Sequence, residues 1–78
     1  AEHVQCRLGQ VVPLSELLPG EVGKRVTWGG LYRIHNGVYE VNRSRNPDSL
    51  EWEYSDYNAP GEEESAKRDT VLIVRDGT

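Results

Sequence analysis

Apolar and polar residues alternate in three stretches of the chain, with the period of two that is typical of half-buried β-strands. Near the N-terminus, Val4, Cys6 and Leu8 alternate with polar neighbours. The alternation returns over residues 24–34 and again over residues 50–54. Each stretch predicts a strand with one face toward a core, and Cys6 is accordingly expected to be a small buried hydrophobic residue.

Two glycine-containing features interrupt or join these stretches. Gly29 and Gly30 lie inside the 24–34 pattern, where a glycine pair predicts a bulge or a sharp bend within one strand. Asn36 and Gly37 follow that pattern and are flanked on both sides by alternating apolar residues. Because both central residues of a type I′ turn need positive φ, the Asn-Gly pair predicts a tight β-hairpin at this point.

The remaining segments predict a short helix, an irregular loop and a buried strand. Residues 13–18 begin with proline, carry apolar residues at helical spacing and are followed by Pro-Gly, which predicts one or two helical turns. Residues 57–67 are rich in glutamate and contain Asn, Pro and Gly, so we expect a mobile acidic loop. Residues 70–74 form a nearly continuous β-branched run, which predicts a central strand buried on both faces.

Together these elements predict an all-β fold with one short helix. Five strands, without an internal repeat, fit a single small domain over residues 1–78, built as an antiparallel SH3-like or OB-like barrel or roll. A chain of this size buries only about 60% of its unfolded surface, so the domain is expected to be marginally stable alone. Its edge strands are natural places for the addition of a strand from another chain.

Composition changes this picture mainly by exclusion. A single cysteine rules out an intrachain disulfide framework and a four-thiolate metal site. No stretch approaches the roughly 20 apolar residues that span a bilayer. We expect a soluble protein that uses no membrane, metal or cofactor, and the sequence leaves open whether it works in the cytoplasm or in a virus particle.

The net charge of −4 hides a sharp division along the chain. Residues 24–45 carry five basic side chains against one acid, a net charge of +4. Residues 46–64 carry seven acids and no base, a net charge of −7. Adjacent blocks of opposite charge indicate complementary contacts, either between strands or with another macromolecule. The candidate partner-binding residues are Arg33, Arg43, Arg45, Glu51, Glu53, Glu62, Glu63 and Glu64.

The inventory of reactive side chains argues against catalysis. His3 and Cys6 are three positions apart on a predicted strand, so their side chains point to opposite faces and do not form a nucleophile–base pair. Glu51 and Glu53 share a face about 7 Å apart. A glycosidase pair also needs a walled cleft, which few domains of this size build. We therefore expect a protein that is not an enzyme.

The aromatic residues raise nucleic-acid binding as an alternative. Trp28, Tyr32 and Tyr39 are interleaved with arginines, an arrangement typical of barrels that bind single strands. The pI near 5.0 argues against a nucleic-acid partner, because such domains are normally basic.

A glycan is the other alternative. A spaced aromatic, an Asn-Gly turn leading to a tyrosine, and a Trp-Glu pair occur at Trp28, at residues 36–39 and at residues 52–53. This arrangement resembles the small chitin-binding modules attached to bacterial chitinases and to some phage tail proteins. The resemblance covers part of the chain and implies that sugar rings stack on Trp28, Tyr39 and Trp52.

The leading functional hypothesis is a non-enzymatic protein–protein interaction module. The small core, the charge division, the lack of other chemistry and an acidic loop at residues 57–67 that could order on binding favour docking to another protein or self-association. By analogy of fold alone, barrels of this size occur as structural components of phages and viruses, and an acidic phage-type inhibitor is a second form of the hypothesis. Binding of a glycan or of single-stranded nucleic acid through exposed aromatics is the alternative.

Overall fold

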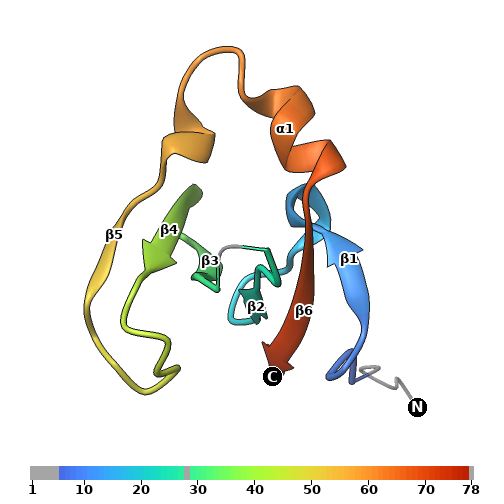
Figure 1. Ribbon diagram of the computed structural model, residues 1–78, viewed down its shortest axis with the longest axis vertical. Helices are drawn as coiled ribbons and strands as arrows, with labels where there is room; N and C mark the ends of the chain where they lie inside the picture. Colours follow the sequence, from blue (N-terminus) through green and yellow to red (C-terminus); the bar gives the residue numbers. More distant parts are fainter. Residues whose placement is uncertain (1–5, 28, 78) are drawn as a thin grey trace.

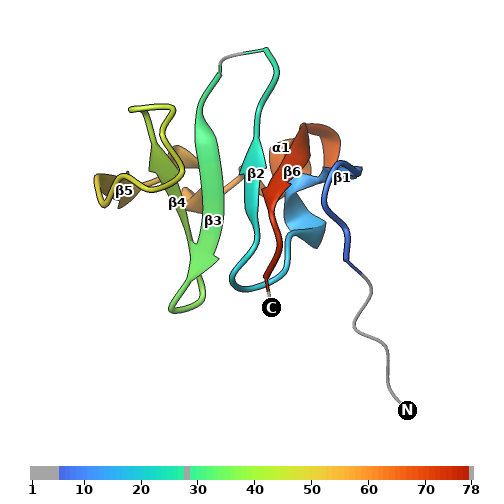
Figure 2. The same ribbon diagram turned by 90° about the horizontal axis from the view of Figure 1, so that it is seen from below.

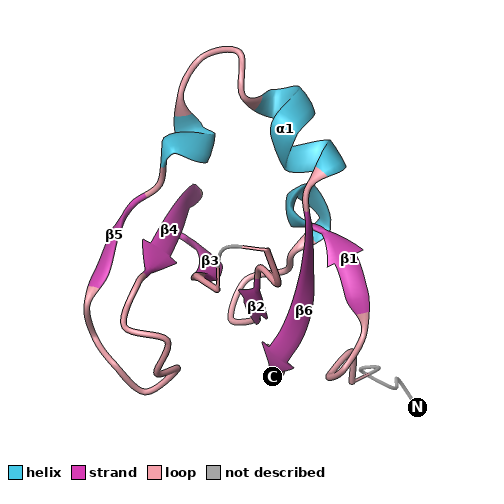
Figure 3. Cartoon of the chain, viewed as in Figure 1, coloured by secondary structure: helices cyan, strands magenta, loops and turns pink. Residues whose placement is uncertain are grey.

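The computed structural model describes residues 6–27 and 29–77. Within these ranges the chain forms one β-sheet, one short α-helix and two 3₁₀ helices, η1 and η2 (Figures 1 and 3). None of these helices has the length and apolar character needed to span a bilayer. The strands are β1 (Val11–Pro13), β2 (Val22–Lys24), β3 (Leu31–His35), β4 (Val38–Asn42), β5 (Trp52–Tyr54) and β6 (Thr70–Arg75). The helical segments are η1 (Leu14–Glu16), η2 (Asp56–Asn58) and α1 (Glu63–Arg68).

The sheet is antiparallel, with the strand order β1-β6-β2-β3-β4-β5, and Figure 2 shows the strands side by side. The prediction of a mainly β fold is confirmed, although the described chain has six strands rather than five. The sheet stays open, because β1 and β5 lie at its two edges and do not pair with each other. It is not closed into a barrel, and the likeness to SH3-like or OB-like barrels stays a prediction.

The sheet is strongly curved, and residues 55–69 lie across the open side of the curve (Figure 1). This segment contains η2 and α1 and leads from β5 to β6. The hydrophobic core lies between the concave face of the sheet and these helical segments. Its buried residues come from strands β1, β3, β4 and β6, from α1 and from the region of η1, and they are Val12, Leu14, Leu17, Tyr32, Val41, Ala66, Val71 and Ile73.

Two local predictions are confirmed. The helical turn η1 forms within the predicted segment, and Leu14 and Leu17 point into the core with 0% and 5% of their surface exposed. Asn36 and Gly37 join β3 to β4 with φ angles of 53° and 79°, as a type I′ turn requires. Both features depend on residues that are neighbours in sequence, which is why a local pattern could predict them.

The glycine pair does not bend a single strand, so that prediction is wrong. β2 and β3 are antiparallel neighbours, and Gly29 and Gly30 fall in the loop that joins them. The N–H of Gly29 donates to the carbonyl oxygen of Arg25 at 2.7 Å, and the N–H of Arg25 donates to the carbonyl oxygen of Gly30 at 2.9 Å. The pair therefore lies in a hydrogen-bonded turn between two strands.

The N-terminal strand and the acidic loop were also predicted wrongly. Cys6 is exposed, and residues 6–10 form no strand. Val4 lies outside the described residues. The acidic segment 57–67 is not an irregular loop, because it contributes to η2 and forms most of α1. This segment folds because Tyr57 and Ala66 pack against the core, which its many glutamates concealed.

Two strands occupy their predicted places but bury less than predicted. β6 lies between β1 and β2, which confirms a central strand. Only its face with Val71 and Ile73 is buried, and Leu72 and Val74 on the other face are partly exposed. At β5, the predicted apolar face does not reach the core, because Leu50 and Tyr54 are 91% and 70% exposed.

Candidate functional site

A cavity of about 430 Å³ opens between the concave face of the sheet and the η2–α1 segment. Strands β3 and β4 supply two of its apolar lining residues, Tyr32 and Val41, and η2 supplies Tyr57. Charged side chains surround these three residues, and arginines outnumber acids among them. They are the guanidinium groups of Arg25, Arg43, Arg45 and Arg68 and the carboxylates of Asp56, Glu62 and Asp69.

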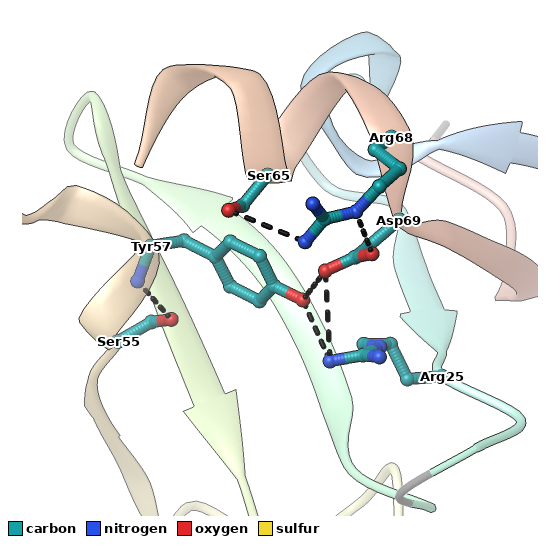
Figure 4. Close-up of polar contacts among 6 residues, drawn as sticks. All are labelled: Arg25, Ser55, Tyr57, Ser65, Arg68 and Asp69. Atoms are coloured by element: carbon teal, nitrogen blue, oxygen red, sulfur yellow. Dashed lines mark hydrogen bonds and ion pairs between the residues drawn. The ribbon is translucent and has the colours of Figure 1, made fainter. Parts of the chain in front are cut away.

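A hydrogen-bonded network runs from η2 to the residue before β6 along this cavity (Figure 4). The hydroxyl of Tyr57 donates to Oδ2 of Asp69 at 2.6 Å and accepts from Nη1 of Arg25, also at 2.6 Å. The same nitrogen of Arg25 lies 3.9 Å from Oδ2 of Asp69. On the other side of the carboxylate, Nε of Arg68 donates to Oδ1 at 3.1 Å. One carboxylate therefore holds a tyrosine and two arginines in place.

These contacts determine the protonation of the network. Burial and the hydrogen bond to Asp69 raise the pKa of the Tyr57 hydroxyl. Hydrogen bonds from Tyr57 and Arg68 lower the pKa of the Asp69 carboxyl. Around neutral pH the phenol is thus protonated and the carboxylate is ionised. Both groups keep these states around neutral pH, and the Asp69 carboxylate holds the guanidinium groups of Arg25 and Arg68 beside the cavity.

The 3₁₀ helix η2 is held firmly enough to place Tyr57. The backbone N–H of Tyr39 donates to Oδ1 of Asn58, and Nδ2 of Asn58 donates to the carbonyl oxygen of Tyr39, both at 2.8 Å. At the start of η2, the hydroxyl of Ser55 accepts from the N–H of Tyr57 at 3.1 Å. The Tyr57 ring packs edge to face against Tyr32, with ring centroids 5.5 Å apart.

Arg43 and Arg45 differ from the other two arginines of the cavity. Neither has a hydrogen bond or ion pair from its side chain to any residue that the structure describes. Arg45 has a φ of 68°, in the left-handed region that disfavours residues with a Cβ. Its guanidinium lies against the β2–β3 loop, where a Cβ added to Gly29 would be 3.3 Å from Nε.

The structure brings three of the predicted partner-binding residues together. Arg43, Arg45 and Glu62 all line the cavity, although Glu62 lies 17 positions after Arg45 in the sequence. Glu63 and Glu64 are exposed on α1, outside the cavity lining, and Glu64 pairs with a lysine one turn later in the same helix at 3.6 Å.

Arg33 lies away from this group. It alternates with Tyr32 along β3 and therefore faces the other side of the sheet. There its Nε donates to Oε1 of Glu40 at 2.8 Å, and its guanidinium lies over the ring of Trp52, 4.4 Å from the centroid. Arg33 is thus engaged within the fold.

The aromatic residues proposed to stack on sugars do not form one platform. Trp28 lies outside the described residues. Tyr39 pairs with Ile34 and packs against the core, whereas Trp52 pairs with Asn42. Because positions 39 and 42 of β4 differ in parity, Tyr39 and Trp52 lie on opposite faces of the sheet.

The two other predicted acids lie at the edge of the sheet. β5 pairs only with β4 among the described strands. Leu50 and Tyr54 are exposed there, as are Glu51 and Glu53 between them. None of these four side chains has a hydrogen bond or ion pair within residues 6–27 and 29–77. We call Leu50, Glu51, Glu53 and Tyr54 the β5 edge surface.

Sequence reasoning missed the centre of the cavity, formed by Arg25, Tyr57, Arg68 and Asp69. The available signal was the presence of Tyr57 and Ala66, two residues suited to burial, inside a strongly polar stretch. The contact between Tyr57 and Arg25 joins residues 32 positions apart, so no local pattern could show it.

Comparison of the chain with protein-family models, with curated proteins and with solved structures gives no match. The part of the chain that the structure describes contains no group of three His, Cys, Asp or Glu side chains that could hold a metal ion. The charged groups that line the cavity include four guanidinium groups, which are hydrogen-bond donors with a permanent positive charge.

Proposed function

We propose that this chain is a non-enzymatic protein-docking module that acts as an accessory subunit of a larger assembly. The observation that supports the proposal is the exposure of Leu50 and Tyr54, at 91% and 70%, on the β5 edge surface. Large apolar side chains that are exposed beside an unpaired strand edge favour docking of another protein there, because covering them removes apolar area from water.

The partner is expected to supply an extended segment that runs along β5. The N–H of Ser55 donates to the carbonyl oxygen of Tyr39 at 3.1 Å. Bonded and non-bonded pairs alternate in an antiparallel ladder, so Glu53 is the next residue bonded to β4. The backbone groups of Tyr54 then face away from β4, toward the free edge, where an added strand can pair with them.

The charge of the surface indicates the chemistry of the partner segment. Glu51 and Glu53 carry two carboxylates without an ionic partner among the described residues. A segment that alternates basic and apolar side chains would neutralise them and cover the exposed apolar groups. Two copies of β5 placed edge to edge would bring like charges together, so we expect the chain alone to be monomeric.

A short synthetic peptide tests the proposal directly. An eight-residue peptide of alternating lysine and valine is titrated into the ¹⁵N-labelled chain, and amide shifts are recorded by NMR. We expect saturable shifts centred on residues 50–55, with a Kd of about 0.1–1 mM because β5 is short. A matched peptide of alternating glutamate and valine is expected to cause no saturable shift.

Variants distinguish peptide binding at the β5 edge surface from nonspecific binding elsewhere on the chain. The double variant Leu50→Ser with Tyr54→Ser should abolish the shifts, whereas Val26→Ser, at a residue 77% exposed in the β2–β3 loop, should leave them unchanged. Equal binding of both peptides, or unchanged binding by the double variant, would show that docking does not use the β5 edge surface.

A further inference from the structure

The arginine-lined cavity has the dimensions of a small-molecule site, and docking at β5 does not use it. Its volume of about 430 Å³ falls within the range of about 300–1,000 Å³ that is usual for ligand pockets. It lies on the concave side of the sheet and shares no lining residue with the β5 edge surface. A ligand in the cavity would therefore contact different residues from those that contact the docking partner.

The charges of the cavity are only partly balanced within the described chain. Asp69 serves both Arg25 and Arg68 through the contacts of Figure 4. Arg43 and Arg45 remain without a counterion, and the two other acids that line the cavity form no ion pair with them. Both arginines are exposed to water, which screens the repulsion between them and leaves both guanidinium groups accessible to an anion. The lining has four guanidinium groups and three carboxylates, a net charge of +1, and the two arginines without an ion pair are the groups that a ligand with two negative charges would contact.

The shape of the cavity indicates that the anion carries an organic part. At roughly 30 Å³ for each water molecule, the cavity would hold about a dozen waters, much more than a bare phosphate fills. Tyr32, Val41 and Tyr57 line it and provide apolar contacts for a ring or a short chain. The Tyr57 hydroxyl already donates to Asp69 and accepts from Arg25, so its hydrogen bonds are satisfied within the protein.

We propose that this cavity binds a small organic phosphate monoester, with its phosphate held by Arg43 and Arg45 and its organic part against Tyr32 and Val41. A phosphate presents three acceptor oxygens and close to two charges at neutral pH, which suits donors that converge from several segments. A carboxylate has two acceptor oxygens but a single charge, so it would neutralise only one of the two free guanidinium groups. A nucleic-acid strand would need a basic groove, whereas here three carboxylates lie among the arginines.

Calorimetric titration of the full chain at pH 7.5 with phenyl phosphate, inorganic phosphate and benzoate tests both parts of the assignment. We expect phenyl phosphate to bind about tenfold more tightly than inorganic phosphate, because only it uses the apolar lining. It should also bind about tenfold more tightly than benzoate, which has one charge less. Equal affinity for the two phosphates would overturn the organic part, and equal affinity for benzoate would overturn the choice of phosphate.

Charge-neutralising variants locate the site. The double variant Arg43→Gln with Arg45→Gln should weaken phenyl phosphate binding by about 10- to 100-fold, and its thermal unfolding without ligand should confirm that it is folded. Lys24→Gln is the matched control, since it removes an exposed positive charge outside the cavity lining, and it should change the affinity by less than about twofold. Absence of binding at about 10 mM phenyl phosphate, or equal losses in the control and the double variant, would overturn the proposal.

Discussion

The hydroxyl of Tyr57 donates a hydrogen bond of 2.6 Å to the carboxylate of Asp69, and this bond ties the segment that spans the open sheet to the start of β6. The same hydroxyl accepts from Arg25, the first residue after β2. Three segments that are distant in sequence therefore meet at one oxygen atom. Tyr57, Asp69 and Arg25 all line the cavity, so the contact lies in its wall.

Removal of the Tyr57 hydroxyl should reduce the stability of the fold. Tyr57→Phe keeps the ring packing against Tyr32 but deletes one donor and one acceptor, so we expect the free energy of unfolding to fall by about 1–2 kcal/mol. Tyr54→Phe is the matched control, because Tyr54 is 70% exposed, and it should cost less than about 0.5 kcal/mol. Urea unfolding followed by far-UV circular dichroism measures both. Equal effects of the two variants would contradict the role given to the network.

The second prediction concerns alkaline pH. Burial raises the pKa of the Tyr57 hydroxyl in the folded protein above the value of about 10 that a tyrosine has when unfolded. Below that pH the contribution of Tyr57 to stability is complete, and it decreases as the pH rises above it, because the unfolded state then releases the proton more readily. The melting temperature should therefore fall more steeply above pH 10 in the wild-type chain than in Tyr57→Phe. Parallel curves for the two proteins would exclude this linkage.

The third prediction concerns acid pH and a buried ion pair. Glu21 is 2% exposed and accepts hydrogen bonds from Nε and Nη2 of Arg7, at 3.0 and 2.8 Å. These bonds lower the pKa of the Glu21 carboxyl, so its contribution is complete above the unfolded pKa of about 4.3 and decreases as the pH falls through the folded value. Glu21→Gln should cost about 2 kcal/mol at pH 7 and reduce the loss of stability below pH 4.

The control for this experiment is Glu64→Gln, since the Glu64 side chain is 84% exposed. Urea unfolding midpoints at pH 7, 5 and 3 should coincide with those of the wild-type chain for this variant. Asp69, whose pKa is lowered by its bond from Tyr57, contributes in the same direction, so part of the acid sensitivity should remain in Glu21→Gln. A steeper acid dependence in Glu21→Gln than in the wild-type chain would contradict the prediction.

The fourth prediction concerns Gly23, which the side chain of Val71 approaches closely. A Cβ at Gly23 would overlap with Cγ2 of Val71 in the core. Gly23→Ala should therefore destabilise the fold by about 2 kcal/mol or more through overpacking. At Gly30 an added Cβ would be 3.4 Å from its nearest neighbour, an ordinary contact, so Gly30→Ala should cost less than about 1 kcal/mol. Thermal unfolding of the two variants decides the comparison.

The fifth prediction compares two leucines of opposite burial. Leu14 has 0% of its surface exposed and Leu50 has 91%. Leu14→Ala should cost about 2–5 kcal/mol by loss of burial and creation of a cavity. Leu50→Ala should change the free energy of unfolding by less than about 0.5 kcal/mol, because an exposed side chain that contacts only a partner adds little to the stability of the chain alone. A large loss of stability in Leu50→Ala would show that Leu50 packs within the fold instead.

Local sequence predicts several of the backbone elements, but it predicts only some of the residues that line the cavity. The Asn36-Gly37 turn and the η1 helix formed where they were predicted, because each is decided by the conformational preferences of adjacent residues. Gly29 and Gly30 were predicted to bend one strand. The sequence did not show that the segments on either side would pair with each other, since pairing depends on β6 and β4 as well.

The charge pattern predicted part of the cavity without showing how it is built. Arg43, Arg45 and Glu62 belong to sequence blocks of opposite charge, and the fold brings them to one cavity. Glu51 and Glu53 belong to the same pattern yet lie at the edge of β5, since the direction of each side chain depends on strand register. The charge pattern thus indicated which charged residues could take part in a binding site, and strand register decided where their side chains lie.

The sequence by itself determined the mainly β character of this protein, the tight hairpin turn at Asn36-Gly37 and the separation of basic from acidic segments. These features depend on composition and on residues within a few positions of each other. Only the tertiary structure decided that the acidic stretch forms η2 and α1 across an open sheet, and that Tyr57 meets Asp69 and Arg25 there. The physical reason is that burial of Tyr57 and Ala66 needs a surface made by other strands, which local preferences do not contain.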